Sequence, residues 1–211
     1  MIYDIRKITK DVRAVLDENR TDGALLLEED SDTLTLDAAI KGRIVEGVRR
    51  VHQQAPLHLT ESGHHFGDSI HQEKDGFGWI LLPDDFMRLL VLEMEGWRRA
   101  VYVAYTPASP QYQRQHSRFA GIRGTAERPV CVLTMRPEGK TLEVYPCSGP
   151  DSTIRQALYL PEPRIDQYGG IDVCNPCYES AVYSIASLTA AIYGESELSA
   201  LLTELARTSL Q

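Results

Sequence analysis

The chain has 211 residues, of which 43% are hydrophobic and 25% charged, a composition typical of a globular protein that can bury a substantial core. Thirty acidic and 22 basic residues give it a formal net charge of -8. This balance disfavours a protein whose main task is to hold nucleic-acid phosphates, so we expect no sequence-specific nucleic-acid partner. The first residues lack a secretory pattern and charges interrupt every apolar run, so we also expect a soluble, non-exported protein with no membrane partner.

The N-terminal part of the chain carries two helical patterns. Between residues 4 and 17, apolar side chains recur at helical spacing and basic side chains fill the opposite face, which predicts an amphipathic helix. An acidic linker follows at 28–32, and Thr35 is then a candidate N-cap for a second helix that ends before Pro56. The apolar stripe of this second helix consists of Ile40, Ile44, Val48 and Val51.

Helical spacing returns near the C-terminal end of the chain, after Pro176. Ala181 and Ile185 begin an apolar stripe that predicts one helix, and the pair Tyr193 and Gly194 marks its end because glycine commonly terminates helices. Leucines at helical spacing then predict a last helix that runs through Leu205.

The middle of the chain has a different pattern, in which Gly, Pro and Asp separate short β-branched or aromatic runs. A hairpin is predicted between 130–135 and 141–145, because Gly139 in the connecting turn can adopt positive φ. Further strands are predicted at 66–72, 79–82, 87–93, 97–105 and 154–160.

Together these patterns predict an α+β fold, in which the N- and C-terminal helices form a helical bundle and an antiparallel β domain is inserted between them. The large aromatic residues Trp79, Phe86 and Trp97 are expected in the core, because each lies in or beside an apolar strand. The predicted regions of this single structural unit are the N-terminal helices at 1–56, the β-rich insertion at 57–165 and the C-terminal helices at 166–211.

A Cys-x-x-Cys motif at Cys174 and Cys177 is the sharpest local signal of chemistry. Two thiols at this spacing beside a helix start could acquire thiolate character or share a metal. A thioredoxin-like motif follows an early strand in a βαβ unit, whereas this one precedes the penultimate helix. A zinc site would need two more ligands, and Cys131 and Cys147 are the remaining cysteines. Reduced, free thiols are therefore the favoured interpretation, and a thiol-redox or metal-binding protein is the alternative.

Five of the six histidines lie between residues 52 and 71, which raises the possibility of a metal cluster. Their spacing does not match a known ligand pattern such as the helical pair of HExxH, and His64 and His65 point in opposite directions if the chain is extended. We therefore assign no metal ligands and expect solvated histidines. The full set is His52, His58, His64, His65 and His71, with Glu61 and Asp68 nearby.

Motifs of the common enzyme classes are missing from the sequence. There is no GxSxG elbow and no Walker loop, and the glycines at 76 and 78 are not followed by the third glycine of a dinucleotide fingerprint. Asp84 and Asp85 follow Pro83 and are expected to form a turn rather than an acid–base pair. We therefore expect no catalytic residues and no cofactor.

One polar segment has the character of a contact surface. Residues 109–118 read SPQYQRQHSR, a Gln- and Arg-rich excursion between β segments whose side chains suit polar interface contacts, although an ordinary solvated loop would have the same composition. The predicted partner-binding residues in this segment are Gln111, Tyr112, Arg114, Gln115 and Arg118.

The order of these elements resembles the head-tail adaptor, or connector, proteins of tailed bacteriophages and prophages. The resemblance rests on the run GWILLPDDFMRL from Gly78 to Leu89, in which Leu82 to Arg88 would close one strand and open the next. It also rests on a helix that begins with Tyr178 and Ala181 after the sheet and reaches Tyr193 and Gly194.

This resemblance implies a non-enzymatic virion-assembly protein. Its copies would form a homo-oligomeric ring beneath the portal, with a helical body packing laterally and loops or termini contacting portal and tail proteins. It would be found in the host cytoplasm during assembly and then in the virion. A negative net charge would suit a channel through which DNA slides.

Overall fold

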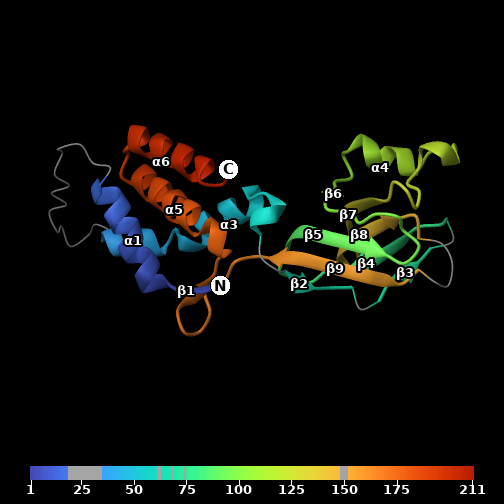
Figure 1. The fold of residues 1–211 in the computed structure, drawn as a ribbon, viewed down its shortest axis with the longest axis horizontal. Coiled ribbons are helices and arrows are strands. Elements are labelled where there is room, and N and C mark those ends of the chain that lie inside the picture. Colours follow the sequence, from blue (N-terminus) through green and yellow to red (C-terminus); the bar gives the residue numbers. More distant parts are fainter. Residues whose placement is uncertain (19–34, 61–62, 68, 74, 148–151) are drawn as a thin grey trace. The chain divides into compact units, whose positions relative to one another are not determined.

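The computed structural model describes residues 1–18, 35–60, 63–67, 69–73, 75–147 and 152–211. The chain folds into two compact units (Figure 1). The helical unit combines Met1–Glu61 with Pro163–Gln211, and the β unit is Ser62–Glu162. Helices and strands are both well represented, which confirms the α+β class. The predicted linker at 28–32 lies outside the described residues.

The helical unit is organised around a helix from the C-terminal part of the chain, α5. The helices that contact α5 come from both ends of the sequence, which confirms the predicted bundle. Small and apolar residues are buried on several sides of α5, as expected for a helix at the centre of a bundle. The helices are α1 (Ile5–Glu18), α2 (Leu36–Lys41), α3 (Ile44–Gln54), α5 (Tyr178–Ile192) and α6 (Ser196–Thr208).

The second predicted helix is two helices. Thr35 is the N-cap, as predicted, and its side chain accepts a hydrogen bond from the backbone N–H of Ala38. The helix then breaks at Gly42 and Arg43, and α3 begins at Ile44. Glycine favours such a break because its helix propensity is low. The whole predicted apolar stripe is buried, so the break redirects the chain without moving the apolar face away from the core.

Hydrogen bonds from serine side chains join α5 to α6, which lie side by side in Figure 1. Ser180 Oγ donates to the carbonyl of Ala206 at 2.7 Å, and Ser187 Oγ donates to the carbonyl of Ser199 at 2.8 Å. Both serines are buried, so these bonds satisfy hydroxyl groups that would otherwise be desolvated without a partner.

A charged and aromatic cluster joins α1 to the start of α5. Tyr178 Oη donates to Asp11 Oδ2 at 2.6 Å, and Lys7 Nζ lies 2.9 Å from the same oxygen. The Tyr178 ring also stacks on Tyr3 at a centroid distance of 4.2 Å. Burial of the phenol, with the hydrogen bond to Asp11 adding to it, raises the pKa of Tyr178 to about 12.

Because the pKa of Tyr178 is raised, we expect the stability of the helical unit to decrease at alkaline pH. Between about pH 10 and pH 12 the phenol of the unfolded chain loses its proton while the folded one keeps it, so the free energy of unfolding falls as pH rises. Tyr178→Phe should make the free energy of unfolding less dependent on pH in this range, as measured by chemical unfolding followed by circular dichroism at several pH values. An unchanged slope would show that Tyr178 does not contribute to it.

A short two-stranded sheet, which the sequence did not predict, also belongs to the helical unit. β1 (Ile2–Asp4) pairs antiparallel with β10 (Gly170–Asp172). The turn before β10 is held by Asp166, whose Oδ1 accepts the backbone N–H groups of Tyr168 and Gly170, both at 2.8 Å. This turn leaves the Tyr168 side chain exposed. Short 3-10 turns at Leu57–Leu59 and Asn175–Cys177 complete the unit.

The β unit contains two sheets. The smaller has the strand order β2-β9-β5 and is antiparallel, with strands His64–His65, Ile154–Pro161 and Phe86–Met94. The larger has the order β3-β4-β8-β7-β6, with strands His71–Gln72, Gly78–Leu81, Gly139–Tyr145, Val130–Arg136 and Ala104–Tyr105. Its pairs are antiparallel except β6 with β7, which is parallel. The predicted hairpin is β7 and β8, with positive φ at Gly139 as expected.

A single hydrophobic cluster draws side chains from both sheets. Phe86 and Leu92 of β5 are buried in it, and Ile80 and Leu142 contribute from the larger sheet. The predicted aromatic core is confirmed for Phe86 and for Trp97, whose Nε1 donates to the Pro146 carbonyl at 3.0 Å. Because this cluster consists entirely of residues from 66 to 159, the β unit has its own core.

The prediction for Trp79 is wrong. Its side chain is half-buried on the opposite face of the larger sheet, where it stacks on His71 at a centroid distance of 4.0 Å. Trp79 and Ile80 are neighbours on β4, so they point to opposite faces, and Ile80 takes the core position. The apolar run on this strand did not reveal which face is buried.

Two predicted strands are also wrong in extent. The 66–72 segment leaves β2 at Phe66, passes through Gly67 with a φ of 83°, and re-forms as β3 in the other sheet. The 97–105 segment makes one bridge, between Val101 and Leu92, before β6. In both cases the chain changes sheets, which ends the regular pairing that a continuous strand requires.

Candidate contact site

The outer face of the larger sheet carries a buried polar network rather than an apolar layer. Glu143 lies on β8 between Leu142 and Val144, whose side chains are in the core, so its carboxylate points to the opposite face. Tyr145 Oη donates to Glu143 Oε2 at 2.7 Å, and Arg136 Nη2 donates to Glu143 Oε1 at 3.1 Å. The carboxylate is therefore paired with both a phenol and a guanidinium.

Aromatic rings extend this network across the sheet. The Arg136 guanidinium lies 4.9 Å from the centre of the Trp79 ring, and Phe77 stacks on Tyr145 at 5.2 Å. Burial raises the pKa of Tyr145, and its hydrogen bond to Glu143 raises it further, so the phenol stays protonated and keeps donating. These contacts make the outer face of the larger sheet an aromatic floor with a paired carboxylate at its centre.

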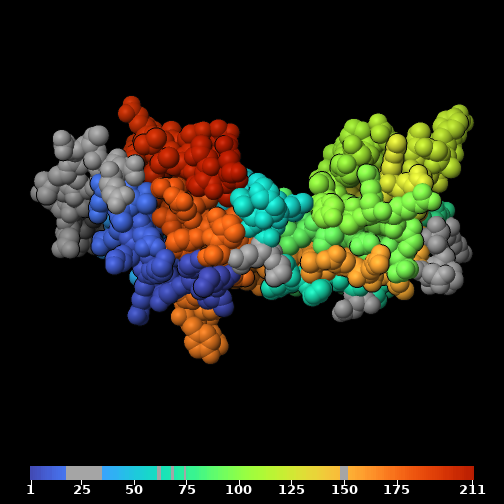
Figure 2. Space-filling view, viewed as in Figure 1, coloured from blue at the N-terminus to red at the C-terminus, as the bar shows by residue number. Residues whose placement is uncertain are grey.

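The predicted contact segment lies over this floor as a folded flap, which we define as residues 109–124. It contains helix α4 (Pro110–Gln115), one 3-10 turn (Ala120–Ile122) and their connection. Ser109 caps α4 by accepting the N–H of Tyr112 at 3.4 Å, and Pro110 fits the first turn because it needs no hydrogen-bond donor there. The segment is thus a short helix and turn, not the loop expected from its composition. In Figure 2 it protrudes from the rest of the β unit.

Gln115 holds the flap together from inside. Its side chain is buried, its Nε2 donates to the Gln111 carbonyl at 2.9 Å, and its Oε1 accepts the Gly124 N–H at 2.7 Å. The prediction that Gln115 binds a partner stays a prediction, and in this structure both polar ends of its side chain are bonded within the flap. A polar side chain can equally close a loop from inside, and the composition of the segment does not distinguish this use from exposure.

Replacing Gln115 is expected to loosen the flap. Gln115→Ala leaves the Gly124 amide without its acceptor, so opening of the flap should become easier by about 1–3 kcal/mol, which is roughly a 5- to 150-fold increase in the open population. Limited trypsin cleavage after Arg118 and Arg123 measures this population. Gln113→Ala is the matched control, since Gln113 is exposed on the same helix. Equal cleavage rates for the two variants would contradict the anchoring role.

The other predicted contact residues are divided between exposed and half-buried positions. Arg114 and Arg118 are exposed, whereas Gln111 and Tyr112 are half-buried. Tyr112 packs edge-on to His116 at 4.6 Å, and burial together with the charge of Glu143 raises its pKa. Of the five residues, the two arginines are the ones that the flap presents most openly.

Two exposed apolar residues of the flap were missed. Phe119 is 62% exposed and Ile122 is 51% exposed, and the Arg118 guanidinium lies 5.1 Å from the centre of the Phe119 ring. The predicted segment ended at Arg118, just before them. Large apolar side chains next to arginines are the residue types that protein interfaces favour, and this signal was present in the sequence.

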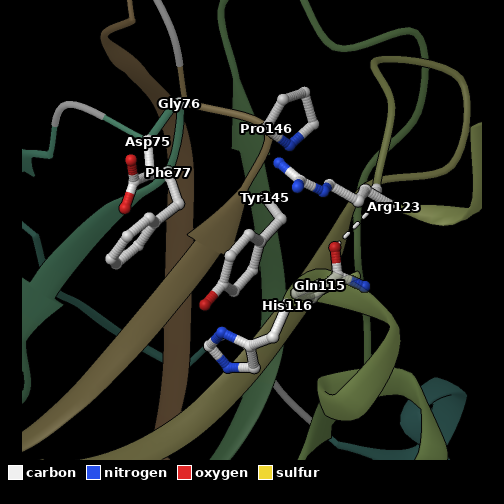
Figure 3. Close-up of a pocket in the computed structure, with 9 residues that line it drawn as sticks. Asp75, Gly76, Phe77, Gln115, His116, Arg123, Tyr145 and Pro146 are labelled. Atoms are coloured by element: carbon white, nitrogen blue, oxygen red, sulfur yellow. Dashed lines mark hydrogen bonds between the residues drawn. The ribbon is translucent and has the colours of Figure 1, made fainter. Parts of the chain in front are cut away.

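A hollow of about 650 Å³ lies between the flap and the sheet (Figure 3). Phe77, Tyr145 and Pro146 line it on the sheet side, and His116 and Arg123 line it on the flap side. Arg123 Nε donates to the Ser117 carbonyl at 2.5 Å, which fixes the guanidinium while leaving its two Nη groups without a hydrogen-bond partner among the described residues. Asp75 is an acidic residue on the lining. The hollow has a volume typical of ligand pockets.

The charge around the flap is opposite in sign to that of the whole chain. Residues 96–126 contain five arginines and no aspartate or glutamate, although the chain has a net charge of -8. Arg98 is paired with Glu127 at 2.9 Å. The flap therefore lies in a basic stretch of an acidic protein.

The Cys-x-x-Cys motif lies elsewhere, in the helical unit. Cys174 and Cys177 are both buried, at 5% and 0% exposure. The Cys174 N–H donates to His52 Nε2 at 3.2 Å, and Cys177 Sγ lies 3.8 Å from the Leu59 carbonyl oxygen. No disulfide bond joins any of the four cysteines, all of which lie in the described ranges, and burial raises the pKa values of Cys131 and Cys147 in the β unit.

The histidine region is divided between the two units. His52 is buried in α3, His58 is exposed nearby, and the strand residues His64, His65 and His71 are exposed in the β unit. Within the described ranges, no group of three or more His, Cys, Asp or Glu side chains has the geometry to hold a metal ion. Glu61 and Asp68 lie outside those ranges.

Two comparisons with known proteins identified no relative of this chain. A scan against models of known protein families finds no match to the chain, and a search of curated proteins finds none either. Among the described helices, none combines the length and apolar character needed to cross a membrane.

Proposed function

We propose that this protein is a structural assembly subunit, and more specifically a head-tail adaptor of a tailed bacteriophage or prophage. The observation that carries the proposal is the flap, which presents exposed arginines beside exposed Phe119 and Ile122 over the aromatic floor. Such a surface is suited to contact with another protein. In this proposal the protein is not an enzyme.

The arrangement of the chain supports the same proposal. Helices from both ends form one unit and an inserted β unit lies between them in sequence, as in the adaptor proteins that the sequence resembles. The Pro83 to Asp85 turn connects β4 to β5, and Tyr178 begins α5 with Ala181 buried behind it. These are the positions on which the resemblance rests.

The subunit would self-associate in a ring and contact portal and tail proteins. It would do so in the host cytoplasm during assembly and would remain in the virion. The exposed flap residues Arg114 and Arg118 are the predicted contacts that the fold leaves available, with Gln111 and Tyr112 beside them.

The gene neighbourhood gives the first test. Sequencing of the flanking DNA should show reading frames for a large terminase, a portal protein and a major capsid protein within a few genes. Co-expression with that portal protein should then give a complex that purifies together. A neighbourhood of metabolic or redox genes would overturn the proposal and direct attention to Cys174 and Cys177.

A further inference from the structure

We propose that the flap and its hollow form the receptor half of a head-to-tail contact between copies of this chain, and that the ligand half is the acidic segment 25–32 of the neighbouring copy. The proposal rests on the ring assembly proposed above. It assigns the hollow a ligand chemistry, which is a peptide that carries carboxylates directly after apolar side chains.

The first argument is that the arginines of the flap form no ion pairs with the described residues. Some basic side chains elsewhere in the described residues are paired with carboxylates, as Arg13 is with Asp37 and Arg155 with Glu93, and others are not. Arg114, Arg118 and Arg123 form no ion pair with any described residue. Three guanidinium groups within ten residues repel one another, and an external carboxylate would relieve this repulsion.

The second argument is the hollow itself. Arg123 lines it with both Nη groups available, and guanidinium groups bind carboxylates with two parallel hydrogen bonds. The aromatic rings of Phe77 and Tyr145 line the sheet side, where an apolar side chain can be buried. The hollow thus offers an anion-binding group next to an aromatic floor, and Asp75 is the one carboxylate among the described residues on its lining.

The third argument is the sequence of the proposed ligand. Residues 25–32 read LLLEEDSD, in which three leucines are followed by four acidic residues within five positions. This order of apolar and acidic side chains matches the floor and the arginines of the flap. The flap lies in a 31-residue stretch, 96–126, that has five arginines and no carboxylate, so its charge is opposite in sign to that of the proposed ligand.

An acidic peptide suits these features better than a nucleic acid does. A phosphate backbone would need basic residues along an extended track, and the net charge of -8 opposes its approach. A half-open hollow with aromatic rings on one side and polar groups on the other favours a short peptide with mixed character. Receptor and ligand are different parts of one chain, so the contact between two copies is heterologous. Repeating such a contact generates a ring when the rotation that relates neighbouring copies brings the last copy back to the first.

Sedimentation velocity of the full-length protein and two variants tests the proposal. The flap variant is R114E/R118E, which changes exposed arginines whose side chains form no hydrogen bond with a described residue. The segment variant is E28Q/E29Q/D30N/D32N. We expect concentration-dependent association for the unmodified protein, monomers for each variant alone, and heterodimers in an equal mixture, because the mixture contains one intact flap and one intact segment per pair.

Peptide binding supplies a second measurement that does not depend on ring formation. A fluorescein-labelled peptide with the sequence of residues 24–34 is titrated with the segment variant, whose own segment cannot compete. We expect saturable binding to the segment variant. Binding should weaken roughly tenfold or more when the segment variant also carries the substitutions R114E/R118E, and by a similar factor when it carries R123Q instead. A peptide in which the three leucines are replaced by serine should also bind more weakly.

The control variant K10E/R164E makes the same change in net charge at exposed positions of the helical unit. It should associate and bind the peptide like the protein it is derived from. Equal effects of the control and flap variants would overturn the proposal, as would peptide binding that is insensitive to the flap. Binding of a duplex DNA oligonucleotide but not of the peptide would overturn it in favour of a nucleic-acid surface. The phage assignment is tested separately by the gene neighbourhood, so either conclusion can fail alone.

Discussion

Phe86→Ala is expected to lower the free energy of unfolding of the β unit by about 3–5 kcal/mol. Phe86 is 1% exposed and lies in the cluster that both sheets share. Its ring stacks on Tyr159 at a centroid distance of 5.5 Å and meets Phe66 edge-on at 5.9 Å. Alanine removes these contacts and leaves a cavity between two sheets whose strand pairing prevents collapse around it.

The tryptophans allow this loss to be measured in the β unit alone. The chain has two, Trp79 and Trp97, and both lie in that unit, so fluorescence during denaturant unfolding reports on the β unit. Met135→Ala is the control, because Met135 lies on β7 of the same unit with 74% exposure and should change stability by less than about 0.5 kcal/mol. A Phe86→Ala loss below about 1 kcal/mol would mean that the cluster is not the core that holds the two sheets together.

The sequence predicted correctly those elements whose structure is determined by residues close together in the chain. The helices and the hairpin around Gly139 followed from spacing and turn chemistry, since each is held by neighbours in sequence. The segments at 66–72 and 97–105 were wrong because the chain there moves from one sheet to the other. Pairing partners far apart in sequence determine that move, and no local pattern records them.

The candidate site was predictable in position but not in detail. Composition directed attention to residues 109–118, because this segment is polar and rich in Gln and Arg. It did not distinguish Gln115, which closes the flap from inside, from Arg114, which faces outward. The sequence also did not predict the floor. A glutamate in a strand is usually a surface residue, and only the structure shows that Glu143 pairs with Tyr145 and Arg136.

Gly47→Val is expected to destabilise the helical unit by about 3 kcal/mol, the upper part of the usual range for overpacking. Gly47 lies on α3 where this helix crosses α5. A Cβ atom at Gly47 would lie 2.4 Å from Ile185 Cγ1 and 3.1 Å from the Ile185 backbone nitrogen. The side chain of Ile185 has no room to move in a buried interface and the backbone of α5 cannot yield locally, so the two helices must separate.

Gly42→Ala is the matched control for this prediction. Its Cβ would lie 3.4 Å from the Ala38 carbonyl oxygen, an ordinary contact, and its φ of -66° suits alanine. Alanine should therefore leave stability unchanged to within about 1 kcal/mol, because it loses less backbone entropy on folding than glycine. Chemical unfolding followed by circular dichroism at 222 nm compares the two variants. If Gly47→Val and Gly42→Ala unfold at the same denaturant concentration, the crossing of α3 and α5 does not require glycine, and the bundle has a looser centre than its packing indicates.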